Sequence, residues 1–318
     1  MQIFESLAEL DLSREAGGCH VAVGTLDGVH RGHAVLIEGL ARKAREEGGK
    51  ALVFTFQNHP RAVVAPASCP PLLSPWPLKR RLLERLPLDY VVALEFDREF
   101  AATPAEAFIR DVLVGRCGAR SIHSGKNFHF GRGGAGGPAL LRSMAEELGY
   151  EYVPLEVVEL EDERISSTRI RECLAGGRVA DAARMLGRPH QVSAPVVTGD
   201  RIGRTIGFPT ANLDERVNMF LPADGVYAVL VRIEEEEEVR PGMMNLGVRP
   251  TVAGREHRSE VHLLDFKGDL AEKSLTVLFI ERLRNERKFA GVEELKAQLE
   301  RDRESAREAL SDISVSPS

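Results

Sequence analysis

The sequence has few cysteines and no long apolar run. Cys19, Cys69, Cys117 and Cys173 are far apart and form no C-x-x-C pair. This spacing argues against a disulfide framework or a cysteine zinc site and favours buried free thiols in a reducing compartment. The chain also lacks a run of about 18 apolar residues and a charged N-terminal segment followed by an apolar one. We therefore expect a soluble, cytoplasmic protein that does not bind membranes.

An excess of basic residues is absent as well. The 42 lysines and arginines are outnumbered by 48 aspartates and glutamates, for a formal net charge of −6. A surface that coats nucleic acid needs a basic excess to displace counterions, so we expect no nucleic-acid partner. The length of 318 residues is more than one core usually organises and predicts two domains.

The first half of the chain alternates short β-branched runs with amphipathic helical patterns. The expected strands are 20–23, 51–56, 90–94, 120–124 and 152–158, and the expected helices are 34–47, 77–86, 104–114 and 139–148. Thr103 as N-cap, Pro104 at the first helical position and Glu106 two residues later predict a capping box for the third helix. The alternation indicates an α/β, Rossmann-like domain: a parallel sheet with helices on both faces and ligands at the carboxyl ends of the strands.

The second half is rich in β-strand patterns. After short helices at 167–175 and 179–186, the residues Gly187, Arg188 and Pro189 break the pattern, so we expect domains at 1–187 and 188–318. The expected strands are 195–198, 226–233, 243–246, 261–266 and 275–280. Turns separate them, which favours an antiparallel β-barrel, followed by a charged terminal helix at 292–310. The glutamate run 234–238 is expected to be a solvated hairpin tip.

The segment G-T-L-D-G-V-H-R-G-H (residues 24–33) follows the first expected strand and opens a helix. Its glycines, Gly24, Gly28 and Gly32, permit close approach of a ligand, and a helix start favours phosphate. His30 and His33 are three residues apart and can reach the same anion. With no nucleophile beside them, the pattern predicts transfer of an adenylyl group by positioning and charge stabilisation. A zinc site is the weaker alternative, because no third ligand is near in sequence.

Two further segments carry phosphate-binding patterns. In R-I-S-S-T-R-I-R (residues 164–171), Ser167 and Thr168 can cap a helix while donating to phosphate, and Arg164 or Arg171 can neutralise a leaving pyrophosphate. In G-D-R-I-G-R-T-I-G-F-P-T-A-N (residues 199–212), the glycines and arginines predict a loop that closes over phosphates; the residues concerned are Gly199, Gly203, Gly207, Arg201 and Arg204. Thr210 and Asn212, as alternate residues of a strand, would offer two oxygens to a Mg²⁺ shared with ATP.

The first half resembles the nucleotidyltransferase superfamily in its H-x-G-H turn and its I-S-S-T-x-I-R element, and bacterial FAD synthetases in two further stretches. T-F-Q-N-H-P (residues 55–60) is similar to their T-F-x-P-H-P, and G-K-N-F-H-F-G (residues 125–131) to their G-x-N-F-x-F-G loop. The resemblance implies FMN as acceptor, with His59 and Asn127 at the flavin and Thr25 and Asp27 in the ATP turn. The chain departs from the family at Leu26, Asn58 and Pro138.

The second half resembles riboflavin kinases in its G-F-P-T-A-N motif and in N-L-G-V-R-P-T (residues 245–251). The strand 259–266 looks like the one that carries their catalytic glutamate, which implies that Glu260 accepts the proton of the riboflavin hydroxyl. R-L-R-N-E-R-K-F (residues 282–289) is similar to their flavin-side flap and implies flavin binding by Arg284. Leu270-Ala271-Glu272 stands where the family has L-Y-G.

Together these resemblances imply a bifunctional riboflavin kinase/FAD synthetase that uses ATP and Mg²⁺ and acts on riboflavin and FMN without an obligate protein partner. Two alternatives stay open. One is a riboflavin kinase whose nucleotidyltransferase domain has drifted, and the other is a flavin-binding regulator without catalysis.

Overall fold

The computed structural model describes residues 1–156, 158–160, 163–198, 207–214, 216–251, 254–311 and 313. Contacts divide the chain into two units, Met1–Ser167 and Thr168–Ser318. This division precedes the expected boundary after Gly187, and the helix pair between the two positions falls in the second unit. None of the described helices is both long and apolar enough to span a lipid bilayer.

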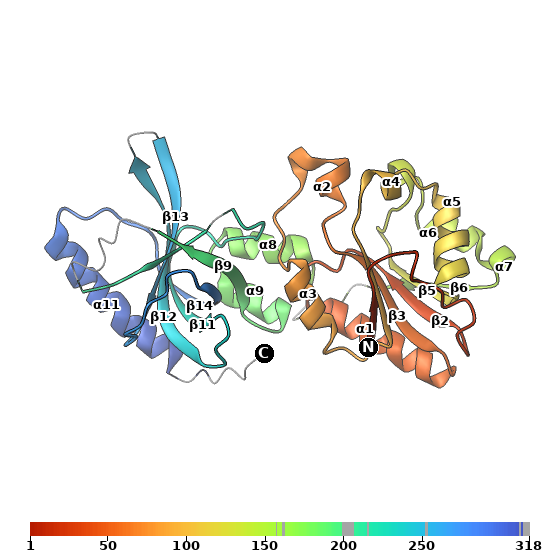
Figure 1. Cartoon of the computed structure of the whole chain (residues 1–318), viewed down its shortest axis with the longest axis horizontal. Helices are drawn as coiled ribbons and strands as arrows, with labels where there is room; N and C mark the ends of the chain where they lie inside the picture. Colours follow the sequence, from red (N-terminus) through yellow and green to blue (C-terminus); the bar gives the residue numbers. More distant parts are fainter. Residues whose placement is uncertain are drawn as a thin grey trace. The chain divides into compact units, whose positions relative to one another are not determined.

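The first unit is a parallel sheet in the order β1-β4-β3-β2-β5-β6, with helices on both faces (Figure 1). Its strands are β1 (Gln2–Phe4), β2 (Cys19–Val23), β3 (Lys50–Phe56), β4 (Tyr90–Leu94), β5 (Ala119–Gly125) and β6 (Glu151–Leu155), with a separate hairpin of β7 (Glu159–Leu160) and β8 (Glu163–Arg164). Its α-helices are α1 (Arg31–Glu46), α2 (Arg61–Val64), α3 (Trp76–Leu83), α4 (Arg98–Ala101), α5 (Ala105–Ala107), α6 (Pro138–Ser143) and α7 (Ala145–Leu148). Short 3-10 turns lie at Pro66–Ser68 and Arg132–Gly134. The α/β class predicted from the sequence is confirmed.

Alternation along β2 assigns the two faces of this sheet. Val21 and Val23 belong to a core with Phe108, Ile109 and Leu141 on one side. Ala22 points the other way, into a core formed with side chains of α1 and α3. Each face is thus sealed by helices, which leaves the carboxyl edge of the sheet available for a ligand.

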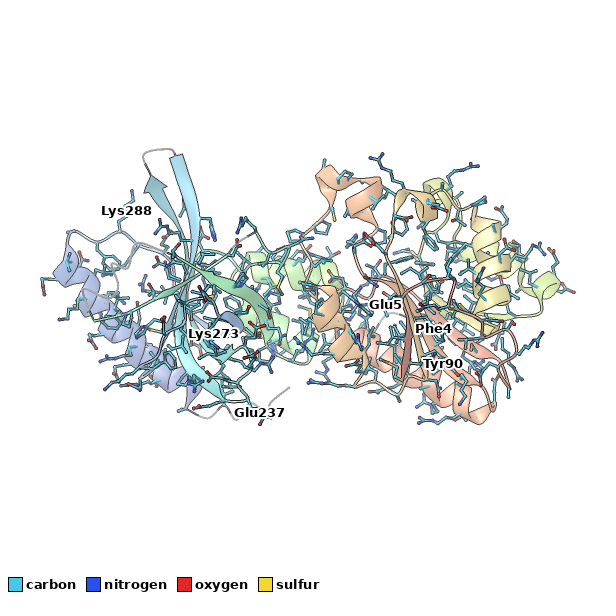
Figure 2. The ribbon with its side chains drawn as sticks, viewed as in Figure 1. Phe4, Glu5, Tyr90, Glu237, Lys273 and Lys288 are labelled. Atoms are coloured by element: carbon cyan, nitrogen blue, oxygen red, sulfur yellow. The ribbon has the colours of Figure 1, made fainter. Side chains whose placement is uncertain are left out.

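Several features of the first unit differ from the expectations. The strand β1 was not predicted; it is three residues long and is held by parallel pairing with β4, and Figure 2 shows Phe4 and Tyr90 close together, their ring centroids 6.0 Å apart. The capping box at Thr103 does not form. Helix α5 begins after Pro104, which takes the cap position, so the Thr103 hydroxyl lies one residue too early to cap it. The Thr103 backbone carbonyl accepts from the Arg132 amide. The expected single helix continues as a π-helix over Phe108–Arg116.

The second unit is a closed barrel, β10-β13-β12-β11-β14-β9, preceded by α8 (Ser167–Ala175) and α9 (Val179–Leu186) and followed by α11 (Val292–Leu310). Its strands are β9 (His190–Val197), β10 (Ala211–Leu213), β11 (Gly225–Ile233), β12 (Val239–Thr251), β13 (Gly254–Leu263) and β14 (Ser274–Arg284). In Figure 1, α11 runs along the barrel and the β12–β13 hairpin extends beyond it. The predicted antiparallel barrel and terminal helix are confirmed, and the glutamates 234–238 form the exposed β11–β12 tip, where Figure 2 labels Glu237.

A buried polar cluster links β2 and β5 under α1. His20 Nδ1 lies 2.8 Å from Ser121 Oγ, and the same hydroxyl lies 2.7 Å from His123 Nε2. Burial is the main cause that lowers the pKa of both imidazoles, that of His123 to about 4. One hydroxyl can donate to one ring and accept from the other only while at least one of the facing ring nitrogens is unprotonated. The hydroxyl bridge therefore requires that at least one of the two imidazoles be neutral.

We expect acid to destabilise the first unit through this cluster. In the unfolded chain His123 binds its proton near pH 6.5, whereas in the fold it resists protonation until about pH 4. Stability is thus fully present above pH 6.5 and falls as the pH drops, by about 3 kcal/mol at most for this residue. Urea unfolding between pH 7 and pH 4.5 measures the slope, which His123→Gln should reduce. The matched control His129→Gln removes an exposed histidine; an equal effect there would contradict the assignment.

Candidate active sites

Three of the sequence motifs leave the first sheet at the same edge. β2 pairs in parallel with β3 and β5, with Val23 opposite both Phe54 and Ser124. The turn after β2, the segment after β3 and the loop after β5 therefore start side by side at the carboxyl ends of the strands. Because β3 and β5 lie on opposite sides of β2, this is also the switch point of the sheet, where such folds bind ligands.

The two histidines of the turn are in contact. His30 is the N-cap of α1, and its Nδ1 accepts from the His33 amide at 3.3 Å. Their rings stack with centroids 3.6 Å apart and planes 15° from parallel. In neutral His30 this acceptor role leaves the proton on Nε2. Gly32 makes room for this arrangement, because a Cβ there would be 3.1 Å from His30 Nδ1.

The turn adopts a backbone that few residues accept. Gly28 has φ of 88°, but Leu26 and Val29 also have positive φ, at 50° and 38°. For the β-branched Val29 this is a strained conformation that persists only when its surroundings impose it. Strain of this kind clusters at functional sites, and here it lies directly before the histidine pair.

Asp27 supplies part of that restraint. Its carboxylate is buried and accepts from the amides of Leu73 and Ser74 at distances of 3.0–3.1 Å, while Ser74 Oγ accepts from the Gly28 amide at 2.8 Å. The carboxylate thus ties the turn to the segment before α3. Its placement is that of an anchor for the turn.

Lys79 of α3 was not among the site residues predicted from the sequence. It is 1% exposed, and its Nζ donates to the carbonyls of Thr25 at 2.9 Å and Phe56 at 2.7 Å. The available signal was its position: Leu78, Leu82 and Leu83 are the other buried residues of α3, so a lysine interrupts an apolar stripe. In the run Lys79-Arg80-Arg81 it looks like one of three solvated cations.

The serine–threonine motif reaches this turn through Ser167. Its Oγ donates to the Asp27 carbonyl at 2.8 Å, so the two motifs are brought together. Arg164 lies on β8, next to Ile165, whose amide bonds to the Val158 carbonyl. Val158 is in turn 3.6 Å from where a Cβ on Gly32 would stand. Thr168 and Arg171 lie on α8, which the contacts assign to the second unit.

The expected flavin residues lie on the segments that leave the same edge. His59 is half-buried and its Nδ1 accepts from the Arg61 amide, while Asn127 is exposed in the loop after β5. Asn58, where the family has proline, exchanges two hydrogen bonds with the Phe96 backbone, at 2.8 and 2.9 Å. The departure at Asn58 thus replaces a stiff residue by a side chain that fixes the segment through hydrogen bonds.

On the barrel, strand register places the expected kinase residues in one row. Glu260 of β13 is directly opposite Asn212 of β10 on one side and Asn245 of β12 on the other. Directly opposite residues project on the same face, with Cβ atoms about 4.5–5.5 Å apart. Thr210 and Asn212 are half-buried and alternate with the buried Ala211 and Leu213, so they share that face.

This row lies on the outer face of the barrel, the face that α11 covers. Met243 alternates with Asn245 onto the same face of β12 and pairs with Ala228 of β11, and both pack with Ala306 and Leu310 of α11. Beside the row, Phe208 contacts His262, whose Nδ1 lies 2.8 Å from the Pro209 carbonyl. The G-F-P-T-A-N motif is therefore anchored next to Glu260.

Arg284 forms an ion pair with a buried carboxylate. Its Nε and Nη2 bond the buried Asp302 of α11 at 2.7–3.0 Å, and Gln298 completes the cluster. The guanidinium also lies 5.7 Å from the centre of the Phe289 ring. It thus joins the end of β14 to α11 and to the segment expected to close beside the flavin.

The glycine-rich loop is described only at its end. Gly207 is exposed with φ of 87°. The predicted phosphate ligands Gly199, Gly203 and Arg204 lie outside the described residues. Within the described part of the chain, no group of three or more His, Cys, Asp or Glu side chains could hold a metal ion, which leaves the zinc alternative without a candidate site there.

Comparison with known proteins accounts for both units. The FAD synthetase family model matches residues 12–169, and the riboflavin kinase family model matches residues 186–310. A bifunctional riboflavin kinase/FMN adenylyltransferase from Escherichia coli strain K12 is 41% identical over 291 residues, which cover 92% of each chain. The chain belongs to the bifunctional riboflavin kinase/FMN adenylyltransferase family. The expectation of a two-activity enzyme is confirmed, and neither alternative gains support.

Other members of the family match along a similar length. The Haemophilus influenzae protein is 36% identical over 96% of this chain and 98% of its own, and the Bacillus subtilis protein is 34% identical over 90% of each. A solved structure described as a macrolide-efflux protein from Streptococcus pneumoniae has a TM-score of 0.82 at 30% identity, covering 98% of this chain and 99% of that one. The macrolide-efflux description applies to the pneumococcal protein.

Proposed function

We propose that the barrel unit transfers the γ-phosphoryl group of ATP to riboflavin, giving FMN and ADP, and that the sheet unit transfers the adenylyl group of a second ATP to FMN, giving FAD and pyrophosphate. The row Asn212–Glu260–Asn245 supports the first activity, and the stacked pair His30–His33 supports the second. We assign residues 1–187 to adenylyl transfer and 188–318 to the kinase, since each range holds one set of motifs.

In the kinase step, Glu260 accepts the proton of the ribityl 5′-hydroxyl as its oxygen attacks the γ-phosphorus and ADP leaves. We base this assignment on the strand register, which places Glu260 between two asparagines. Their amide groups can orient the carboxylate toward the hydroxyl that it must deprotonate. Gly199, Gly203, Arg204 and Gly207 are proposed to close over the phosphates.

The metal of the kinase step is proposed to be Mg²⁺ held by Thr210 and Asn212. Their neutral oxygens lie on one face of the chain beside Glu260, a donor set that suits a hard cation shared with ATP phosphates. Bound there, Mg²⁺ would neutralise charge on the phosphates. Arg284 is proposed to serve the flavin by holding the segment after β14 against α11 through Asp302.

In the adenylyl transfer, an FMN phosphate oxygen attacks the α-phosphorus of ATP and the bond to pyrophosphate breaks. His30 and His33 donate to the non-bridging oxygens, where negative charge grows. Gly24, Thr25, Gly28 and Gly32 are proposed to line the phosphate site, with the Gly24 and Gly28 amides held by the Phe54 carbonyl and by Ser74 Oγ. Ser167 shapes this turn by donating to the Asp27 carbonyl, and Ser74 does so through the Asp27 carboxylate and the Gly28 amide.

Arg164, Thr168 and Arg171 are proposed to meet the leaving pyrophosphate, and His59 and Asn127 to meet the flavin. The four free thiols are consistent with work in the cytoplasm, where we place the enzyme.

Incubation with riboflavin, ATP and Mg²⁺, followed by chromatographic separation of flavins, tests both activities. FMN should form first and FAD should follow from it. Supplying FMN in place of riboflavin should give FAD directly, with one pyrophosphate per FAD. If riboflavin and FMN both stay unchanged, the proposal is wrong.

A further inference from the structure

The buried lysine of α3 has no role in the steps above, yet it lies directly beneath the turn that carries them. Lys79 Nζ donates to the last residue of β3, through the Phe56 carbonyl, and to the turn itself, through the Thr25 carbonyl. The Thr25 carbonyl accepts a second bond, from Thr55 Oγ1 at 3.0 Å. The peptide that follows Thr25 is therefore fixed by two donors from two different elements.

Packing alone does not explain a buried ammonium, because its desolvation costs free energy. Burial lowers the pKa of Lys79 to about 8, with the charge of Asp27 opposing that effect. An apolar side chain of similar volume would fill the same space without the cost of desolvating an ammonium. The side chain has three donors and no acceptor, and two of those donors hold backbone carbonyls of the site.

Lys79 is one of the side chains whose hydrogen bonds hold the turn. Lys79 holds the Thr25 end of the T-L-D stretch through its carbonyl, and the Asp27 carboxylate holds the other end by accepting from the Ser74 amide. Leu26, between them, has φ of 50°, a conformation that must be imposed on it. The strained turn, in turn, sets where α1 and its histidine pair begin.

We propose that Lys79 is a positioning residue for adenylyl transfer: its buried ammonium holds the Thr25 carbonyl, fixes the turn before His30 and His33, and adds positive charge beneath the bound phosphates. The inference rests on the proposed adenylyl transfer at this turn. Its chemistry differs from that of a lysine that touches phosphate, because both donors counted here act on backbone carbonyls.

Lys79→Met in the full chain tests the proposal. A methionine fills the space but cannot hold the carbonyls, so kcat for FAD formation from FMN should fall about 10- to 100-fold, as a misplaced catalytic constellation does. Conversion of riboflavin to FMN by the same preparation should stay within about twofold of the unchanged chain, the spread we allow for a distant, independent site. Unchanged kcat for FAD formation would overturn the proposal.

Leu83→Ala is the matched control for damage to α3. Leu83 is fully buried on the same helix and packs with α1 and β3 side chains, and it has no donor for the carbonyls. It should lower the melting temperature while kcat for FAD formation is retained below the transition. If Leu83→Ala lowers kcat as much as Lys79→Met does, Lys79 is merely structural and the proposal fails.

If Lys79→Met does not fold, the pH dependence of FAD formation by the unchanged enzyme tests the role of Lys79. Asp27 is the charged side chain that acts on Lys79, and the ammonium loses its proton as the pH rises past about 8. The neutral amine keeps two N–H donors for the two carbonyls but has lost its charge. FAD formation should therefore decline above that pH through loss of the charge, while FMN formation does not; a flat profile to pH 9.5 for FAD formation would overturn the proposal as stated, because the positive charge is part of it. If the unchanged enzyme makes no FAD at any pH, the proposed adenylyl transfer itself has failed.

Discussion

Replacing His33 with phenylalanine is expected to reduce FAD formation from FMN about 10²- to 10³-fold, the cost of removing one preorganised donor from a developing negative charge. The kinase step should be unchanged, since Glu260, Asn212 and Asn245 belong to the other unit. Phenylalanine is chosen because it keeps a ring against His30, at the position where the two imidazoles now stack. Rates of FAD and FMN formation measured on one preparation give both results.

Two comparisons separate donation from packing at this position. His33→Ala removes the ring as well, so its FAD formation should be no better than that of His33→Phe. His33→Gln restores an N–H donor and should recover part of the activity. If His33→Phe is as active as the unchanged enzyme and only His33→Ala is impaired, stacking is what matters and the donor role is wrong.

The histidine pair shows why much of the first site could be predicted. Its spacing, its glycines and its place after an apolar strand are local properties, and a parallel sheet sends every such turn to one edge. The register of β2 with β3 and β5 then confirms the shared edge. What the local pattern could not give is that His30 caps α1 through its own ring.

Two features of the sites could not be predicted from the sequence: the burial of Lys79 and the pairing of Asn212 with Glu260. A lysine within a cationic run reads as solvated, and only the packing of α3 under the turn reveals it as buried. Strand β10 is three residues long, with too few positions for a pattern, and its register is set by the barrel closing around it. Thr103 is the converse case: its local pattern predicts a cap, but α5 begins one residue later, with Pro104 in the cap position and no side-chain cap.

Glu260→Gln is expected to have the largest effect on the barrel unit. Glutamine keeps the size of the side chain and its place between Asn212 and Asn245, but it cannot take the proton of the riboflavin hydroxyl. General base catalysis contributes about 10²- to 10⁴-fold, so FMN formation should fall by that factor. FAD formation from added FMN should continue at its usual rate, which makes the pattern the reverse of that for His33.

Two further variants decide whether the carboxylate acts as a base. Glu281→Gln changes an exposed glutamate on β14 of the same barrel and should leave both steps unchanged. Asn212→Ala should instead raise the Mg²⁺ concentration needed for half-maximal FMN formation, because it removes a proposed metal ligand while the base stays in place. If Glu260→Gln shows that same Mg²⁺ dependence and recovers its full rate at high Mg²⁺, Glu260 serves the metal and the assignment as base must be abandoned.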